Sequence, residues 1–106
     1  MEVSVIGSGV GGLAAGLRML RRGHDCTIYE RQDQIGGRAR VFERGEYVFD
    51  AGPTIITAPF LFEELFELFG EDLHDHVKLV RMDPWYRIRY GDGDTLDFSD
   101  SVEGMV

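Results

Sequence analysis

The sequence predicts an α/β fold that starts with one β–α–β unit and continues with a hairpin, a helix and antiparallel strands. Three observations predict it. A β-branched run at Val3, Val5 and Ile6 stops at a glycine loop, leucines then recur at helical spacing, and a second β-rich run follows. Such a unit forms a right-handed crossover between two parallel strands.

The elements of this unit follow from local signals. The three leucines that recur after the loop predict a helix over about residues 11–22. Gly23 ends it, because glycine commonly follows a helix whose last turn carries cations. Residues 26–29 then form a strand that closes on Glu30.

The rest of the chain has weaker patterns. Residues 31–40 are polar and are expected to form a loop or a short helical turn. Two antiparallel strands are expected between residues 39 and 50, with a turn at Gly45, and Pro59 opens a helix that runs through Phe69. Further strands are expected at residues 77–81, 85–90 and 95–98.

Composition limits the partners. The formal charge of −8 at pH 7 disfavours nucleic acid, whose phosphates normally require a surplus of Lys and Arg. The single cysteine, Cys26, excludes a disulfide within the chain and a metal site built on several thiolates. No apolar run approaches the roughly 18 residues of a membrane span. We expect a cytoplasmic protein without a nucleic-acid partner, and the composition leaves its oligomeric state open.

The glycine loop carries the clearest functional signal. Gly7, Gly9 and Gly12 fit the pattern G-x-G-x-x-G between a strand and a helix, and Glu30 follows 18 positions after Gly12 at the end of the second strand. A chance glycine turn with a surface glutamate is the alternative. The register of strand, glycines, helix and acid favours a dinucleotide site.

Each position of this loop has a physical task. Gly7 permits the tight turn, Gly9 lets a pyrophosphate approach backbone N–H groups, and Gly12 allows the helix to pack close to the strand. The helix N-terminus stabilises the phosphates, and Glu30 accepts hydrogen bonds from an adenosine ribose. An acid here disfavours a 2′-phosphate, which predicts FAD or NAD rather than NADP.

Three segments resemble the N-terminus of the FAD-dependent phytoene desaturases (carotenoid dehydrogenases), relatives of the amine oxidases. They are VIGSGVGGLAAGLRML, YERQDQIGGRAR and FDAGPTIIT. The resemblance implies a Rossmann-like FAD-binding fold, with Arg38 beside the FAD pyrophosphate or ribityl chain and residues 52–54 along the isoalloxazine ring. The resulting set of expected FAD-binding residues is Gly7, Ser8, Gly9, Val10, Gly11, Gly12, Glu30, Arg31, Gly37, Arg38, Gly52, Pro53 and Thr54.

The resemblance also implies an activity, which is FAD-dependent dehydrogenation of a long lipophilic isoprenoid such as phytoene. An amine oxidase or protoporphyrinogen oxidase-like enzyme, and a noncatalytic dinucleotide-binding module, stay as alternatives. We expect residues 1–58 to belong to the FAD-binding domain and residues 59–106 to start a substrate domain that is incomplete here. The chain alone is expected to be inactive, and we identify no catalytic residue in it.

Two other features have competing interpretations. His74 and His76 flank Asp75, but a spacing of two gives no shared helical face, so we expect a solvated loop and no metal site. The helix after Pro59 carries more aromatic and leucine residues than a narrow core stripe needs. Core packing is the favoured interpretation, and a lipophilic substrate channel or peripheral membrane contact is the alternative.

Overall fold

The computed structural model describes residues 1–52 and 55–99. The chain divides into two compact units, Met1–His76 and Val77–Val106. The predicted FAD-binding residues Pro53 and Thr54 lie outside the described residues.

The first unit begins with the predicted β–α–β arrangement. Strand β1 (Glu2–Ile6) leads through the glycine loop into helix α1 (Val10–Arg21), and strand β2 (Asp25–Tyr29) returns beside β1. The two strands are parallel, with Val3 opposite Cys26 and Val5 opposite Ile28. The mixed α/β class and the order of these three elements are therefore confirmed.

Helix α1 covers one face of this small sheet. The half-buried strand residues alternate with exposed ones, as a sheet covered on one side requires. Gly16 is buried against β2, where an added Cβ would lie 3.1 Å from Cδ1 of Ile28. On the opposite face Ile6 is 83% exposed and Tyr29 is 56% exposed, so the described residues leave that face uncovered.

The segment after β2 ends in a short helical turn and a hairpin. A short 3₁₀ turn, η1 (Gly37–Ala39), precedes an antiparallel hairpin of β3 (Val41–Arg44) and β4 (Tyr47–Asp50). Gly45 lies in the turn with φ of +62°, a conformation that favours glycine. The predicted loop with a helical turn and the predicted hairpin are both confirmed.

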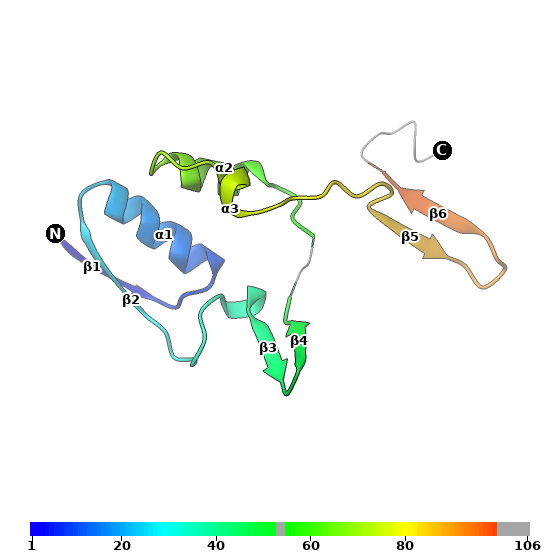
Figure 1. Ribbon diagram of the computed structural model, residues 1–106, viewed down its shortest axis with the longest axis horizontal. Helices are drawn as coiled ribbons and strands as arrows, with labels where there is room; N and C mark the ends of the chain where they lie inside the picture. Colours follow the sequence, from blue (N-terminus) through cyan, green and yellow to red (C-terminus); the bar gives the residue numbers. More distant parts are fainter. Residues whose placement is uncertain (53–54, 100–106) are drawn as a thin grey trace. The chain divides into compact units, whose positions relative to one another are not determined.

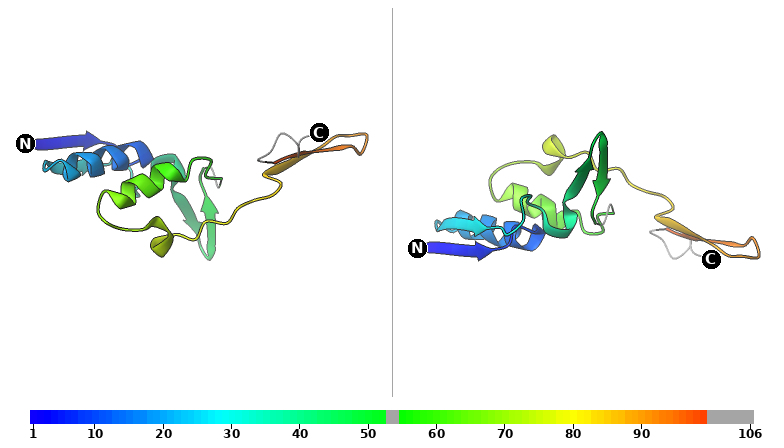
Figure 2. Two further views of the ribbon diagram at one scale, coloured as in Figure 1. Left: turned by 90° about the horizontal axis from the view of Figure 1, so that it is seen from above. Right: turned by 90° about the horizontal axis from the view of Figure 1, so that it is seen from below.

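Helix α2 (Phe60–Glu67) follows and packs beside α1, as Figures 1 and 2 show. Two arginines of α1 hold it there. Nη2 of Arg18 lies 2.9 Å from Oε1 of Glu64, and Nε of Arg21 donates a 2.7 Å hydrogen bond to the carbonyl oxygen of Leu68. The second contact satisfies a carbonyl at the C-terminal end of α2 that the helix itself leaves free.

A helical turn, α3 (Leu73–His76), stands where we expected a solvated loop, so that prediction is wrong. Its cause is local. Oδ1 of Asp72 accepts a 2.8 Å hydrogen bond from the backbone N–H of His74, which is an N-capping contact. Leu73 is only 4% exposed and anchors the turn.

The second unit is an antiparallel hairpin of β5 (Tyr86–Arg89) and β6 (Thr95–Phe98). The rings of Tyr86 and Phe98 stack with centroids 4.4 Å apart. Arg87 forms a bidentate ion pair with Asp97, with one hydrogen bond to each carboxylate oxygen. These two predicted strands are confirmed. The strand expected at residues 77–81 is wrong, because no strand forms there.

The predicted boundary between residues 58 and 59 concerns the domains of a longer protein and stays a prediction. Within this chain, α2 belongs to the first unit, where it contacts α1 and α3. Over the residues that the structure describes, no helix is both long and apolar enough to cross a membrane.

Candidate dinucleotide-binding site

The glycine loop forms a tight connection between β1 and α1. Gly7 has φ of +96°, and its N–H donates a 2.7 Å hydrogen bond to the carbonyl oxygen of Tyr29, which ties the loop to the end of β2. A Cβ on Gly12 would overlap the carbonyl oxygen of Gly7. The roles predicted for Gly7 in the turn and for Gly12 in close packing both match this geometry.

The N-terminus of α1 is open to an anion. Its N-cap residue is Gly9, no side chain caps it, and the first turn holds no acidic residue. N–H groups in the first turn of a helix have no acceptor within the helix, and the helix dipole places positive charge there. Val10 and Gly11, which begin the helix, are exposed. The end of α1 can therefore accept phosphate oxygens.

Glu30 is held at the end of β2 by neutral donors. Its Oε2 accepts hydrogen bonds from the N–H of Ser8 at 2.8 Å and from the hydroxyl of Ser8 at 2.7 Å, and its Oε1 accepts one from the N–H of Gln32 at 2.8 Å. The Gln32 N–H, then the two donors of Ser8, lower the pKa of Glu30 from 4.5 to about 2. The carboxylate beside the glycine loop is therefore ionised at neutral pH.

The Gly36–Gly37 pair braces the glycine loop. Gly9 and Gly36 form a parallel bridge, and the N–H of Gly36 donates a 2.9 Å hydrogen bond to the carbonyl oxygen of Ser8. A Cβ on Gly37 would lie 2.9 Å from the Cα of Gly9. The pair therefore lies in close contact with the glycine loop, and the predicted contact of Gly37 with FAD stays a prediction.

Two arginines that follow this pair differ in their surroundings. The guanidinium carbon of Arg40 lies 4.7 Å from the ring centroid of Phe42, so Arg40 stacks on the hairpin. Arg38 is exposed, and none of the described residues forms an ion pair or hydrogen bond with its side chain. Arg38 thus has a free guanidinium next to the glycine pair. Arg31, also in the predicted set, is exposed beside Glu30.

Gly52 has an intramolecular reason to be glycine. A Cβ on Gly52 would overlap the carbonyl oxygen of Arg38, and the N–H of Ala51 donates a 2.9 Å hydrogen bond to the carbonyl oxygen of Arg40. The residues that follow β4 therefore pack directly against the segment that carries Arg38. The predicted contact of Gly52 with a ligand stays a prediction.

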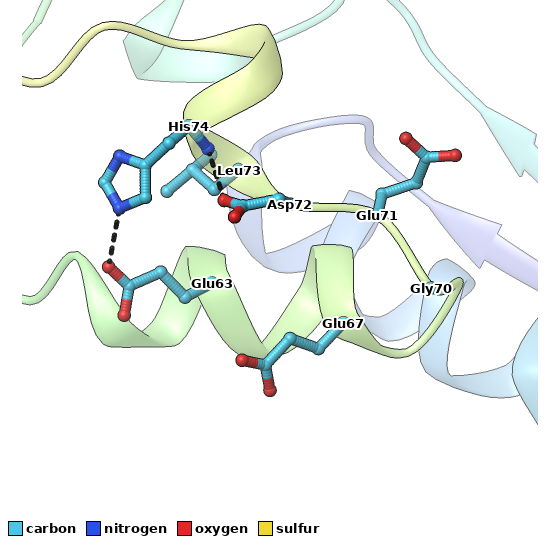
Figure 3. Close-up of a pocket in the computed structure, with 7 residues that line it drawn as sticks. All are labelled: Glu63, Glu67, Gly70, Glu71, Asp72, Leu73 and His74. Atoms are coloured by element: carbon cyan, nitrogen blue, oxygen red, sulfur yellow. Dashed lines mark hydrogen bonds and ion pairs between the residues drawn. The ribbon is translucent and has the colours of Figure 1, made fainter.

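A pocket lies between α2 and α3, and Figure 3 shows it. His74 and Glu63 face each other there, with Nε2 of His74 3.4 Å from Oε1 of Glu63. The other lining residues are mostly acidic and come from α2, from the turn before α3 and from Leu73 at the start of α3. Across residues 1–52 and 55–99, no three His, Cys, Asp or Glu side chains are grouped so that they could hold a metal ion.

The aromatic residues of α2 divide into two sets. Phe62, Leu65 and Phe66 are half-buried in the first unit, as core packing requires. Phe60 is 62% exposed and Leu61 is 48% exposed. The start of α2 therefore presents an apolar surface that the described residues do not cover.

The glycine loop, the open helix end and an ionised Glu30 fit one kind of ligand. This ligand is a dinucleotide whose adenosine ribose carries no 2′-phosphate. Comparison with known proteins gives the family. Residues 10–104 match the family described as flavin containing amine oxidoreductase. The chain belongs to this family. Because the family contains flavin, the cofactor is FAD rather than NAD.

Relatives in the family carry carotenoid names. The chain is 45% identical over 96 residues to a phytoene dehydrogenase of Streptomyces griseus, covering 91% of this chain and 19% of that protein. It is 44% identical over 100 residues to a lycopene-forming phytoene desaturase of Pseudescherichia vulneris, covering 93% of this chain and 20% of that protein. The chain thus spans about a fifth of the length of these curated relatives.

A solved structure supports the fold of this family member. The crystal structure of the PF1083 protein from Pyrococcus furiosus superimposes with a TM-score of 0.65 and 24% sequence identity, covering 90% of this chain and 24% of that one. At this identity the similarity concerns the fold alone.

Ser8 is the residue whose role the sequence did not reveal. It entered the predicted set only as a member of the loop, yet both of its donors are directed at Glu30. A small polar residue between two glycines, with an acid at the end of the next parallel strand, was the available signal.

Proposed function

We propose that this chain supplies the adenosine and pyrophosphate part of a Rossmann-like FAD-binding domain in an oxidoreductase that dehydrogenates a long isoprenoid. The observation that supports it most is Glu30, held ionised beside an uncapped helix end in a chain of this flavin family. A structural glutamate in an ordinary turn would have no reason to lie beside an open anion site.

In this proposal each part of the site has one task. The N-terminus of α1 holds the pyrophosphate without a basic side chain. Glu30 accepts a hydrogen bond from the adenosine ribose, and Arg38, with its free guanidinium, pairs with a phosphate oxygen. The Gly36–Gly37 pair acts indirectly, because it fixes the backbone of the loop that receives the phosphates.

The substrate class comes from the relatives, which are named for phytoene. When bound, the flavin would accept one substrate hydrogen as a hydride as a carbon–carbon single bond becomes double, and the second hydrogen would leave as a proton to solvent or to a base in the rest of the protein. The described residues bind and orient the cofactor, and none of them is assigned a proton transfer. The substrate and the remaining parts of the flavin site belong to the rest of the protein in this proposal.

The test is to supply phytoene in detergent micelles to the full-length protein loaded with FAD. We expect products with more conjugated double bonds, which absorb at longer wavelength, and reduction of the flavin in anaerobic samples. An amine oxidase is the second candidate, because the family description itself names amines. Flavin reduction by a panel of amines, without reduction by phytoene, would reverse the choice.

Peripheral membrane contact is the part of the proposal that concerns location. The exposed Phe60 and Leu61 at the start of α2 would enter the lipid, and the acidic residues that follow on the helix favour uncharged over anionic headgroups. Co-sedimentation of the full-length protein with phosphatidylcholine vesicles should fall in a Phe60→Ser/Leu61→Ser variant. Val80→Ser, which removes an exposed apolar side chain elsewhere, is the matched control.

A further inference from the structure

Ser8 has an unusual position for a serine in a loop. Ser8 is 2% exposed and is the one buried polar residue in the part of the chain that the structure describes. Its hydroxyl donates a 2.7 Å hydrogen bond to Oε2 of Glu30, and its N–H donates a second one to the same oxygen at 2.8 Å. Hydrogen bonds to an ionised acceptor are stronger than those between neutral groups.

These contacts determine where the Glu30 carboxylate points. A carboxylate offers about four acceptor positions over two oxygens. Ser8 uses two of them on Oε2 and the N–H of Gln32 uses one on Oε1, so acceptor capacity is left while the group is held from both sides. A glutamate without these donors would have to give up rotamer freedom when a ligand binds.

We propose that Ser8 is a positioning residue, whose hydroxyl holds Glu30 in the orientation that receives the 2′-hydroxyl of the FAD ribose. The hydroxyl acts on Glu30 and not on the cofactor. This role rests on the proposed function, since it requires that Glu30 bind the ribose.

The N–H of residue 8 is present with any side chain except that of proline. Only the hydroxyl contact therefore depends on having serine at this position. Alanine at position 8 keeps the backbone contact and removes the side-chain contact. Because Glu30 would then have to give up rotamer freedom when FAD binds, loss of the hydroxyl should weaken FAD binding by about tenfold. The same substitution at Ser4, an exposed residue of β1, touches neither Glu30 nor the loop and serves as the control.

The test is a double-mutant cycle on the full-length protein, with FAD affinity measured by flavin fluorescence. Ser8→Ala should weaken binding about tenfold in the wild-type background and have little effect in a Glu30→Ala background. Equal losses in both backgrounds would overturn the proposal, because Ser8 would then act without Glu30. If Ser8→Ala does not fold, Ser8→Cys fills the buried space with a weaker donor and takes its place.

A second readout separates positioning from simple loss of structure. ADP and 2′-deoxy-ADP compete with FAD for the site, and the ratio of their affinities measures recognition of the 2′-hydroxyl. Ser8→Ala should bring this ratio close to one, whereas Ser4→Ala should leave it as in the wild type. An unchanged ratio in Ser8→Ala contradicts the positioning role. If the wild type binds FAD but Glu30→Ala binds equally well, the ribose assignment in the proposed function fails as well.

Discussion

The backbones of Gly9 and Gly37 lie so close that a Cβ on Gly37 would stand 2.9 Å from the Cα of Gly9. The contact joins two motifs separated along the chain, the glycine loop and the Gly-Gly-Arg segment. It explains why position 37 needs glycine, whereas a Cβ on Gly9 would lie at an ordinary contact distance, 3.8 Å from the Cα of Gly37. The segment that carries Arg38 therefore packs against the loop that is proposed to receive the pyrophosphate and stabilises its backbone.

Gly37→Ala should damage the site through this contact. Gly37 has φ of +59°, where alanine costs about 1 kcal/mol, and displacement of Gly9 adds roughly 1–3 kcal/mol. Chemical denaturation of the apoprotein and FAD titration measure the two effects. Gly45→Ala is a matched control, since Gly45 has φ of +62° but an added Cβ there meets no atom within 4 Å. Equal losses in both variants would show that the Gly9–Gly37 contact contributes nothing.

Gly12→Ala should prevent the loop from closing. The added Cβ would overlap the carbonyl oxygen of Gly7, a backbone atom that cannot move without opening the turn. We expect loss of FAD binding together with destabilisation of the apoprotein by about 2 kcal/mol or more. Gly11→Ala is the comparison, because a Cβ there lies in open space and alanine favours the helix by up to about 1 kcal/mol. An apoprotein Gly12→Ala variant as stable as Gly11→Ala would contradict the packing role.

The ionisation of Glu30 predicts a pH dependence of stability. Hydrogen bonds from Gln32 and Ser8 lower its pKa in the folded state from 4.5 to about 2. A lowered pKa means that the unfolded state binds the proton more readily, so the stabilisation is fully present above about pH 4.5 and is lost as the pH falls toward 2. The difference in unfolding free energy between the wild type and Glu30→Gln should therefore be constant from pH 7 to 5 and shrink below that range. Urea denaturation at several pH values measures it, and a difference that does not change with pH would refute it.

The contact between Arg21 and Leu68 predicts a local effect on α2. Removing the guanidinium with Arg21→Ala leaves the Leu68 carbonyl without this donor, which should cost about 0.5–1 kcal/mol because the contact is exposed. Hydrogen exchange of the α2 amides should become faster. Arg22→Ala changes the neighbouring exposed arginine and should leave that exchange unchanged. Equal rates in the two variants would rule out a role of Arg21 in holding α2.

The β–α–β unit and the two hairpins could be predicted because local patterns and tertiary packing agree there. Val3 and Val5 alternate with exposed residues, and α1 covers the face they share. Residues 77–81 show the limit of this reasoning. They have β-branched side chains, but a strand needs a partner, and among the described residues none pairs with them.

Within the site, the sequence predicted which residues gather but not always why. Glu30 and the glycine loop follow from the motif, whereas the close approach of Gly37 to Gly9 depends on a tertiary contact that spacing does not encode. The burial of Ser8 has the same origin. The α3 turn could have been found from Asp72, a good N-cap residue placed two positions before His74.

The most direct test of the central claim is a titration of FAD into the full-length protein and its Glu30→Ala variant, followed by quenching of flavin fluorescence. We predict saturable quenching by the wild type and an affinity at least about tenfold lower for Glu30→Ala, because a charged acceptor for the ribose is lost. No quenching by the wild type, or equal affinity of the two proteins, would contradict the assignment of this loop and its glutamate to FAD.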